Sequence, residues 1–247
     1  FGTAGKDSDF KLTERHGAAV VANNLGLAAF VEARYADALV CFERAAALNE
    51  KEWVHHQNVA SALQNLNRLD EAVVRAMAGL KHGGRTPEQD MFVAELLAAA
   101  GKHEEAVTLL ERLRKKGRLS EDGLLQLVNA HGALGAWERA LAVVTEYGGD
   151  APTLRQLRWK ATLLGNAGKP AERVALARNL ATSHPEDPAL RAELAQAHAA
   201  AGEWREVITV VDQLLASGEK TPALLTLKAR AQGELGAARD ALATADA

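Results

Sequence analysis

A repeat of about 34 residues is the feature that most limits the folds open to this chain of 247 residues. One position of the repeat is mostly small or apolar, and it is occupied by Ala38, Ala72, Ala106, Ala140, Arg173, Val207 and Ala241. Five residues earlier lies a small or turn-forming residue, at Ala33, Asn67, Gly101, Gly135, Gly168, Gly202 and Gly236. A period of this length is typical of chains in which supersecondary units stack on their neighbours. The sequence therefore predicts a repeat protein.

Each unit shows apolar residues at helical spacing on both sides of the turn. In the first unit, Leu25 and Ala29 precede the turn, and Ala38, Phe42 and Ala45 follow it. No stretch alternates polar and apolar residues over a sustained length, so strands are not expected. The pattern indicates about seven helix–turn–helix units.

Several helix starts carry their own capping residues. Side-chain oxygens lie in front of predicted helices at Thr86, Ser120, Asp187 and Thr221, and proline follows three of the four. Thr86 and Gln89 also have the spacing of a capping box. These residues predict where the first turns begin.

A single helix pair cannot bury its apolar faces, and stacking gives the pairs a continuous core with an inner and an outer face. Their length and their pattern of small and large residues resemble the tetratricopeptide repeat (TPR). The best single match comprises Asn24, Leu25, Gly26, Ala38, Phe42 and Ala45. The resemblance implies an all-α, right-handed α-solenoid of about seven tandem repeats.

The repeats are expected near residues 19–52, 53–86, 87–120, 121–153, 154–187, 188–221 and 222–247. Together they form one predicted superhelical domain over residues 14–247. Residues 1–13 fall outside the period, and they are interpreted as a flexible N-terminal segment or a remnant of cloning. A helix is expected to begin near Thr13.

The fifth unit departs most from the family pattern. Arg173 occupies a position where the family has a small residue, and Lys160 occupies one that is usually apolar. Either the second helix of this unit is shifted by one residue or the unit is locally distorted. We therefore expect the fifth unit to open more readily than the second or third.

No constellation of residues indicates catalysis. His103 and Glu104 begin a zinc-protease pattern that lacks its second histidine, and the adjacent His55 and His56 are interpreted as solvated surface residues. Cys41 is the single cysteine, so no disulfide within the chain is expected. The chain is predicted to be no enzyme, with no catalytic residues, no metal ligands and no cofactor.

Charge and composition narrow the classes of partner. The formal net charge is −3, and basic residues are interleaved with acids such as Glu111, Glu121 and Asp122, so nucleic-acid binding is disfavoured. No apolar run is long enough to span a membrane. A single cysteine favours the cytoplasm slightly over the periplasm.

Polar and aromatic residues recur on the face of the first helices that the resemblance places along the concave groove. Amides there can pair with the backbone of an extended peptide, and aromatic rings between them offer apolar contact. The predicted partner-binding residues are Asn24, Gln57, Asn58, Ser61, Asn65, Met91, Phe92, Glu95, Gln126, Asn129, Arg158, Trp159 and Thr162. The alternative is that these residues merely solvate a wide groove.

Two details refine this prediction. Arg158 has an alternative partner within the chain, Asp122 on the preceding unit. The lysine, asparagine and arginine clamp with which chaperone-binding family members hold a C-terminal carboxylate is not reproduced, because Leu27 and Phe92 occupy two of its positions. Recognition of chaperone tails is therefore not predicted.

The leading functional hypothesis is a non-enzymatic scaffold that binds an extended peptide or a helix of a partner protein in its concave groove. One alternative is the substrate-recognition arm of a larger enzyme. Another is a self-assembling scaffold, in which the C-terminal repeat stacks on another copy through an apolar tip of Leu224, Leu225 and Leu227.

Overall fold

The computed structural model describes residues 3–82 and 85–245, and all regular elements in these residues are α-helices. The helices are α1 (Thr3–Val31), α2 (Tyr35–Leu48), α3 (Trp53–Asn65), α4 (Leu69–Gly79), α5 (Pro87–Ala99), α6 (His103–Lys115), α7 (Glu121–Ala133), α8 (Trp137–Gly148), α9 (Leu154–Asn166), α10 (Pro170–Ser183), α11 (Pro188–Ala200), α12 (Trp204–Ala216), α13 (Pro222–Glu234) and α14 (Ala238–Ala245). The prediction of an all-α solenoid of tandem helix pairs is confirmed.

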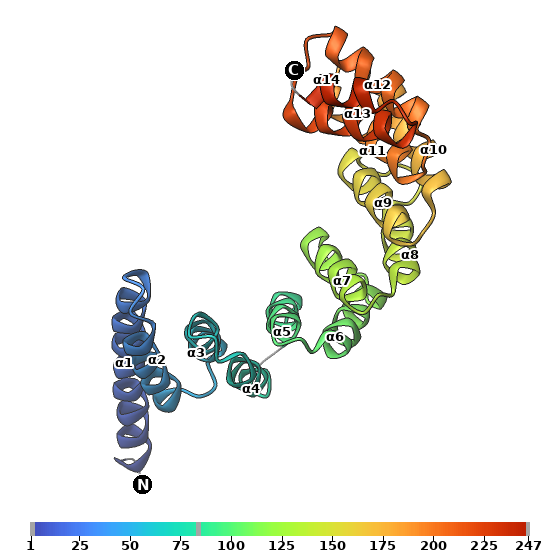
Figure 1. The fold of residues 1–247 in the computed structure, drawn as a ribbon. Coiled ribbons are helices and arrows are strands. Elements are labelled where there is room, and N and C mark those ends of the chain that lie inside the picture. The colour runs from blue at the N-terminus through green and yellow to red at the C-terminus, as the bar shows by residue number, and fades with distance from the viewer. Residues whose placement is uncertain (1–2, 83–84, 246–247) are drawn as a thin grey trace. The chain divides into compact units, whose positions relative to one another are not determined.

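The chain divides into two compact units, Phe1–Leu134 with α1 to α7 and Gly135–Ala247 with α8 to α14. Within each unit, every helix packs against the next helix along the chain (Figure 1). The core of each unit is therefore a row of layers between neighbouring helices, as expected of stacked repeats.

The turn inside each pair depends on one left-handed residue. Five of these turns use glycine, with φ between 67° and 82°, whereas Ala33 and Asn67 adopt φ of 58° in the first two pairs. The next amide then bonds back to the helix, as Arg34 N does to the carbonyl of Ala29 at 2.9 Å. This is the hydrogen bond of a left-handed helix C-cap, and it explains why the small turn residue recurs in the sequence.

The expected capping residues start their helices. Thr86 Oγ1 accepts from Gln89 N at 3.3 Å and Gln89 Oε1 accepts from Thr86 N at 3.1 Å, so the predicted capping box is confirmed. The side chains of Ser120, Asp187 and Thr221 also accept backbone hydrogen bonds. A second capping box, formed by Thr153 with the residue three positions later, was present in the sequence and was missed.

One position of the first helix shows how the pairs bury each other. This packing position is occupied by Leu25, Val59, Val93, Leu127, Lys160, Leu194 and Lys228. Val59 and Leu127 are 0% exposed, whereas Leu25 is 59% exposed. Helix α1 packs on α2 much as α3 packs on α4, so the partner helix does not explain why Leu25 is exposed and Val59 is buried. The explanation is that α3 also packs against the preceding helix α2. The expectation that Leu25 is a packing residue is wrong, since no other described helix covers that side of α1.

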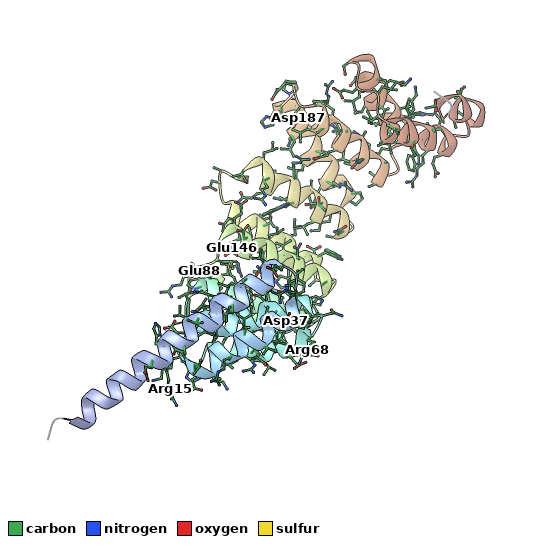
Figure 2. The ribbon with its side chains drawn as sticks, turned by 90° about the vertical axis from the view of Figure 1, so that its left-hand side faces the viewer. Arg15, Asp37, Arg68, Glu88, Glu146 and Asp187 are labelled. Atoms are coloured by element: carbon green, nitrogen blue, oxygen red, sulfur yellow. The ribbon has the colours of Figure 1, made fainter. Side chains whose placement is uncertain are left out.

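The N-terminal helix is longer than expected. It begins at Thr3 rather than near Thr13, and in both views α1 extends well past the end of α2 (Figures 1 and 2). Residues 3–13 contain no proline, and one glycine in a helix costs only about 1 kcal/mol, so nothing in the sequence stops the helix sooner. The interpretation of residues 1–13 falls partly on residues 1–2, which lie outside the described part.

Helix α10 keeps the register of the repeat despite Arg173. Ala177 and Leu180 are buried at the positions where Phe42 and Ala45 are buried in α2. The side chain of Arg173 crosses Gly165 on α9, where a Cβ would lie 2.9 Å from Arg173 Nη1. The hypothesis of a one-residue shift is wrong, because glycine leaves room for the arginine. The easier opening of this unit stays a prediction.

The apolar tip expected on the C-terminal repeat is covered in part, because Leu224 is buried while Leu225 and Leu227 are half-buried. Leu224 belongs to a buried cluster with Val211 and Leu214 of α12, and Leu227 packs against this cluster. The expectation that Leu224 is a surface residue is therefore wrong, because it fills the layer between α12 and α13.

His55 and His56 are buried, so their interpretation as solvated residues is wrong. Both lie on α3, which packs against α2. His56 Nε2 lies 2.9 Å from the carbonyl oxygen of Glu50, but His55 Nδ1 has no hydrogen-bond partner among the described residues. A buried imidazole of this kind disfavours its charged form.

We expect acid to destabilise the protein through His55. Burial lowers the pKa of His55 from its ordinary value of 6.5; the charges of His56 and His16 act in the same direction, and Glu52 opposes them. At mildly acidic pH the unfolded chain binds a proton that the folded imidazole does not. The stability is therefore present above pH 6.5 and is lost as pH falls through the folded pKa.

The variant His55→Leu should flatten this pH dependence, and leucine already occupies the equivalent position at Leu190 and Leu224. Urea unfolding at several pH values between about 7.5 and 5.5 measures the slope. His82→Gln changes an exposed histidine and serves as the matched control. Equal slopes for the wild type and His55→Leu would contradict the expectation.

Candidate functional site

The predicted binding face is not part of the core. The groove position is occupied by Asn24, Asn58, Phe92, Gln126, Trp159, Glu193 and Leu227, and none of these residues is buried. Asn24 is exposed, whereas Asn58 is half-buried and donates a hydrogen bond from Nδ2 to Oδ1 of Asn23 at 2.7 Å. The amides at the start of the face thus pair partly with one another.

The large side chains of this face in the first compact unit are engaged by neighbours. Phe92 meets the ring of Trp53 edge-on, with centroids 6.0 Å apart. Met91 Sδ accepts a hydrogen bond from Ser120 Oγ at 3.2 Å and lies over Gly123. Trp53 and Ser120 were not among the predicted residues, and neither carries a repeat signal that would have identified it.

The other predicted residues of the first unit are half-buried or exposed. Gln57 and Ser61 are half-buried, and the carbonyl of Ser61 accepts from Asn65 Nδ2 at 2.9 Å. The exposed members of this group are Asn65, Glu95 and Asn129. Gln126 is half-buried, and its Oε1 has no hydrogen-bond partner among the described residues. This surface offers amides and one carboxylate.

The second compact unit brings three predicted residues together around a cavity. The cavity has a volume of about 540 Å³ and lies between α9, α10 and α11. We call it the arginine cavity; its polar and aromatic walls are Arg155, Arg158, Trp159, Thr162, Arg173, Glu193 and Gln196. The buried side chains of Leu180 and Leu190 contribute apolar surface. This combination of apolar surface with a few convergent polar groups is typical of a ligand site.

Two arginines of this cavity have partners that position them. Arg158 forms an ion pair with Glu193 of α11, and its backbone carbonyl accepts from Thr162 Oγ1 at 3.1 Å. The guanidinium of Arg155 lies over the Trp159 ring, 5.0 Å from the centroid. A cation over an indole face is a favourable contact, and it holds the half-buried ring in place.

The partner of Arg158 differs from the one expected. The expected alternative is a pair with Asp122, but the carboxylate that reaches Arg158 belongs to Glu193 on the next first helix. The first helices of neighbouring repeats face each other in a stack. The residue at the Trp159 position of the next repeat is therefore well placed to contact Arg158. The sequence carries this signal, because Glu193 occupies the groove position.

Sequence reasoning also missed Arg173 as a wall of the cavity. The sequence does mark Arg173 as unusual, because an arginine replaces the small residue found at this position of most other repeats. From the sequence alone, this replacement was interpreted as a weak point in packing. The structure shows that the same exception directs a guanidinium from α10 toward the surface of α9 and α11. The described residues contain no group of three or more histidine, cysteine or acidic side chains arranged for a metal ion.

Among the described helices, none has a stretch long and apolar enough to cross a lipid bilayer.

Comparison with known proteins agrees with this architecture. A family model described as a tetratricopeptide repeat matches residues 167–231, which include α11 and α12. No curated protein matches the chain in sequence.

Solved structures extend the likeness over most of the chain. A tetratricopeptide repeat protein from Parabacteroides merdae has a TM-score of 0.64 at 14% identity, covering 92% of this chain and 91% of that one. A chain in a structure of Naa15/Naa10 bound to HypK-THB has a TM-score of 0.61 at 14% identity, covering 91% of this chain but only 35% of its own length. A MamA protein has a TM-score of 0.58 at 9% identity, covering 68% of this chain and 93% of that one. At these identities the likeness shows the fold alone.

Proposed function

Because this chain is a tetratricopeptide repeat protein, we propose that it is a non-enzymatic scaffold that binds a segment of a partner protein. The anchoring site in this proposal is the arginine cavity, which lies within the second compact unit. The partner segment is an extended peptide or a helix, both of which a groove of first helices accommodates.

The observation that carries the proposal is the state of Trp159. Its ring lines a cavity, is half-buried, and lies under the guanidinium of Arg155. Trp53 contacts Phe92 and does not line this cavity. Trp204 also lies under an arginine, Arg230, but its ring packs against a buried cluster. A fixed aromatic ring at the edge of a cavity is the type of residue that dominates binding energy at protein interfaces.

Replacing Trp159 with alanine should weaken partner binding by about 2 kcal/mol or more, because an anchor residue loses most of its contact area. Helicity and melting temperature should change little, since the ring contributes to a surface cavity. The partner is first identified by a pull-down from the native organism with mass spectrometry. Titration calorimetry with the purified partner then measures the difference.

Trp204→Ala is the matched control for this experiment. Trp204 packs against the cluster of Val207, Val211 and Leu214, so its removal should lower the melting temperature. If Trp159→Ala unfolds the protein as Trp204→Ala does, then Trp159 is a core residue and the proposed anchor is wrong. Unchanged binding by a folded Trp159→Ala variant would also reject it.

A further inference from the structure

We propose that Arg173 makes the arginine cavity a subsite for a carboxylate side chain of the bound segment. This inference rests on the proposed function, because it assigns a chemical class to the residue that the cavity holds. It starts from the position of Arg173, where the other pairs carry Ala38, Ala72, Ala106, Ala140, Val207 and Ala241. A long cation at this position is an exception that packing alone does not require.

The geometry of α9 is adapted to this exception. Gly165 faces the Arg173 side chain, and a Cβ at residue 165 would lie within 2.9 Å of Nη1 and 3.3 Å of Cδ. The glycine lets the arginine stem lie flat on α9, so its head reaches the wall of the cavity. The side chain is half-buried, which strengthens its interaction with an anion relative to a fully solvated position.

One arginine of the cavity wall, Arg173, has no carboxylate partner among the described residues. The cavity walls carry three arginines and one carboxylate, Glu193, which is already paired with Arg158. An arginine in this situation provides a planar set of donors for an incoming anion.

The surroundings select the kind of anion. Leu180 and Leu190 add apolar surface to the cavity that Arg173 lines, so the best occupant is an acidic residue of a peptide next to an apolar residue. A nucleic acid fits less well, because Arg155 already covers a face of Trp159 that a base would need for stacking.

The test uses the full chain and three probes at constant ionic strength. The first is a nine-residue capped peptide of alternating glutamate, leucine and glycine, and the second replaces its glutamates with glutamine. The third is a nine-nucleotide thymidine oligomer. Binding is followed by NMR through the side-chain Nε–Hε signal of Arg173, which is assigned by its loss in the variant Arg173→Ala.

We expect the glutamate peptide to shift this signal and to bind about tenfold more weakly to Arg173→Ala, because a charge-assisted hydrogen bond is lost. Arg178→Ala, an exposed arginine of the same helix outside the cavity, should leave the affinity unchanged. Arg173→Ala introduces the residue that most other pairs carry, so it should fold. Circular dichroism verifies this.

The proposal is overturned if the glutamine peptide binds as tightly as the glutamate peptide, or if the oligonucleotide alone shifts the Arg173 signal. It is also overturned if no probe binds to the wild type, or if Arg173→Ala and Arg178→Ala behave alike. If Arg173→Ala keeps its affinity while Trp159→Ala loses it for both peptides, the carboxylate subsite fails and the anchor at Trp159 stands. Loss of affinity in Arg173→Ala but not in Trp159→Ala would support the carboxylate subsite and reject the anchor.

Discussion

Replacing Leu127 with alanine should lower the free energy of unfolding by about 3 kcal/mol, whereas the same change at Leu25 should alter it by less than about 0.5 kcal/mol. Both leucines occupy the packing position of a first helix, and the chemical change is identical. Leu127 is 0% exposed and Leu25 is 59% exposed, so only the first substitution leaves a cavity. Alanine is the best helix former, so helix propensity does not oppose either change.

Urea unfolding followed by circular dichroism measures both variants. Leu194 holds the same position and is nearly buried, so Leu194→Ala should fall between the other two and closer to Leu127→Ala. Equal losses at Leu25 and Leu127 would mean that the outer face of α1 is covered in solution. A small loss at Leu127 would mean that the layer of α7 is loosely packed.

Replacing Asp90 with alanine should cost about 2–3 kcal/mol, which is the second largest effect that we expect. Asp90 lies on α5 and is 4% exposed. Its carboxylate accepts from Arg85, in the loop before the helix, and from Arg112 Nη2 on α6 at 3.0 Å. It therefore ties α5 both to its own entry loop and to its partner helix. The two guanidinium groups remain open to solvent in the variant, which limits the loss to these charged hydrogen bonds.

Asp37→Ala is the matched control for this prediction. Asp37, labelled in Figure 2, pairs with Arg34 at 2.7 Å, but both side chains are more than half exposed. An exposed pair of this kind contributes at most about 1 kcal/mol. The same urea experiment compares the two variants. If Asp90→Ala loses no more stability than Asp37→Ala, the buried carboxylate adds nothing to the packing of α5 on α6.

The helix pairs could be predicted because their determinants are local. The left-handed glycine of each turn, the threonine caps and the spacing of apolar residues act within one or two turns of helix. The repeat period also predicted the correct register for α10 at Arg173. The sequence alone, however, left a shift of one residue open as an alternative. What stood against the shift was Gly165 on α9, which faces Arg173 and is not adjacent to it in the chain.

The environments of single side chains were harder to predict, because they depend on the neighbouring pair. His55 and Leu25 are examples in opposite directions: the histidine is buried and the leucine is exposed. Each residue lies on the first helix of its pair, on the side that faces the preceding pair. That side is buried only where a preceding pair stacks on it. Arg158 is a third example, since its carboxylate comes from α11 and not from α7. Repeat position identified the face of each helix but not the partner across it.

The side chain at the packing position also determines the type of contact between neighbouring helix pairs. In the first compact unit, Val59, Val93 and Leu127 are buried there, whereas the second unit carries Lys160 and Lys228 on either side of Leu194. Lys228 is held by an ion pair with Asp212 at 2.6 Å, which replaces dry contact with a salt-sensitive one. In denaturant, the pairs joined at Lys160 and Lys228 should then separate more readily at high salt than at low salt. A segment bound across α9, α10 and α11 would stabilise the stacking of these helices against such separation.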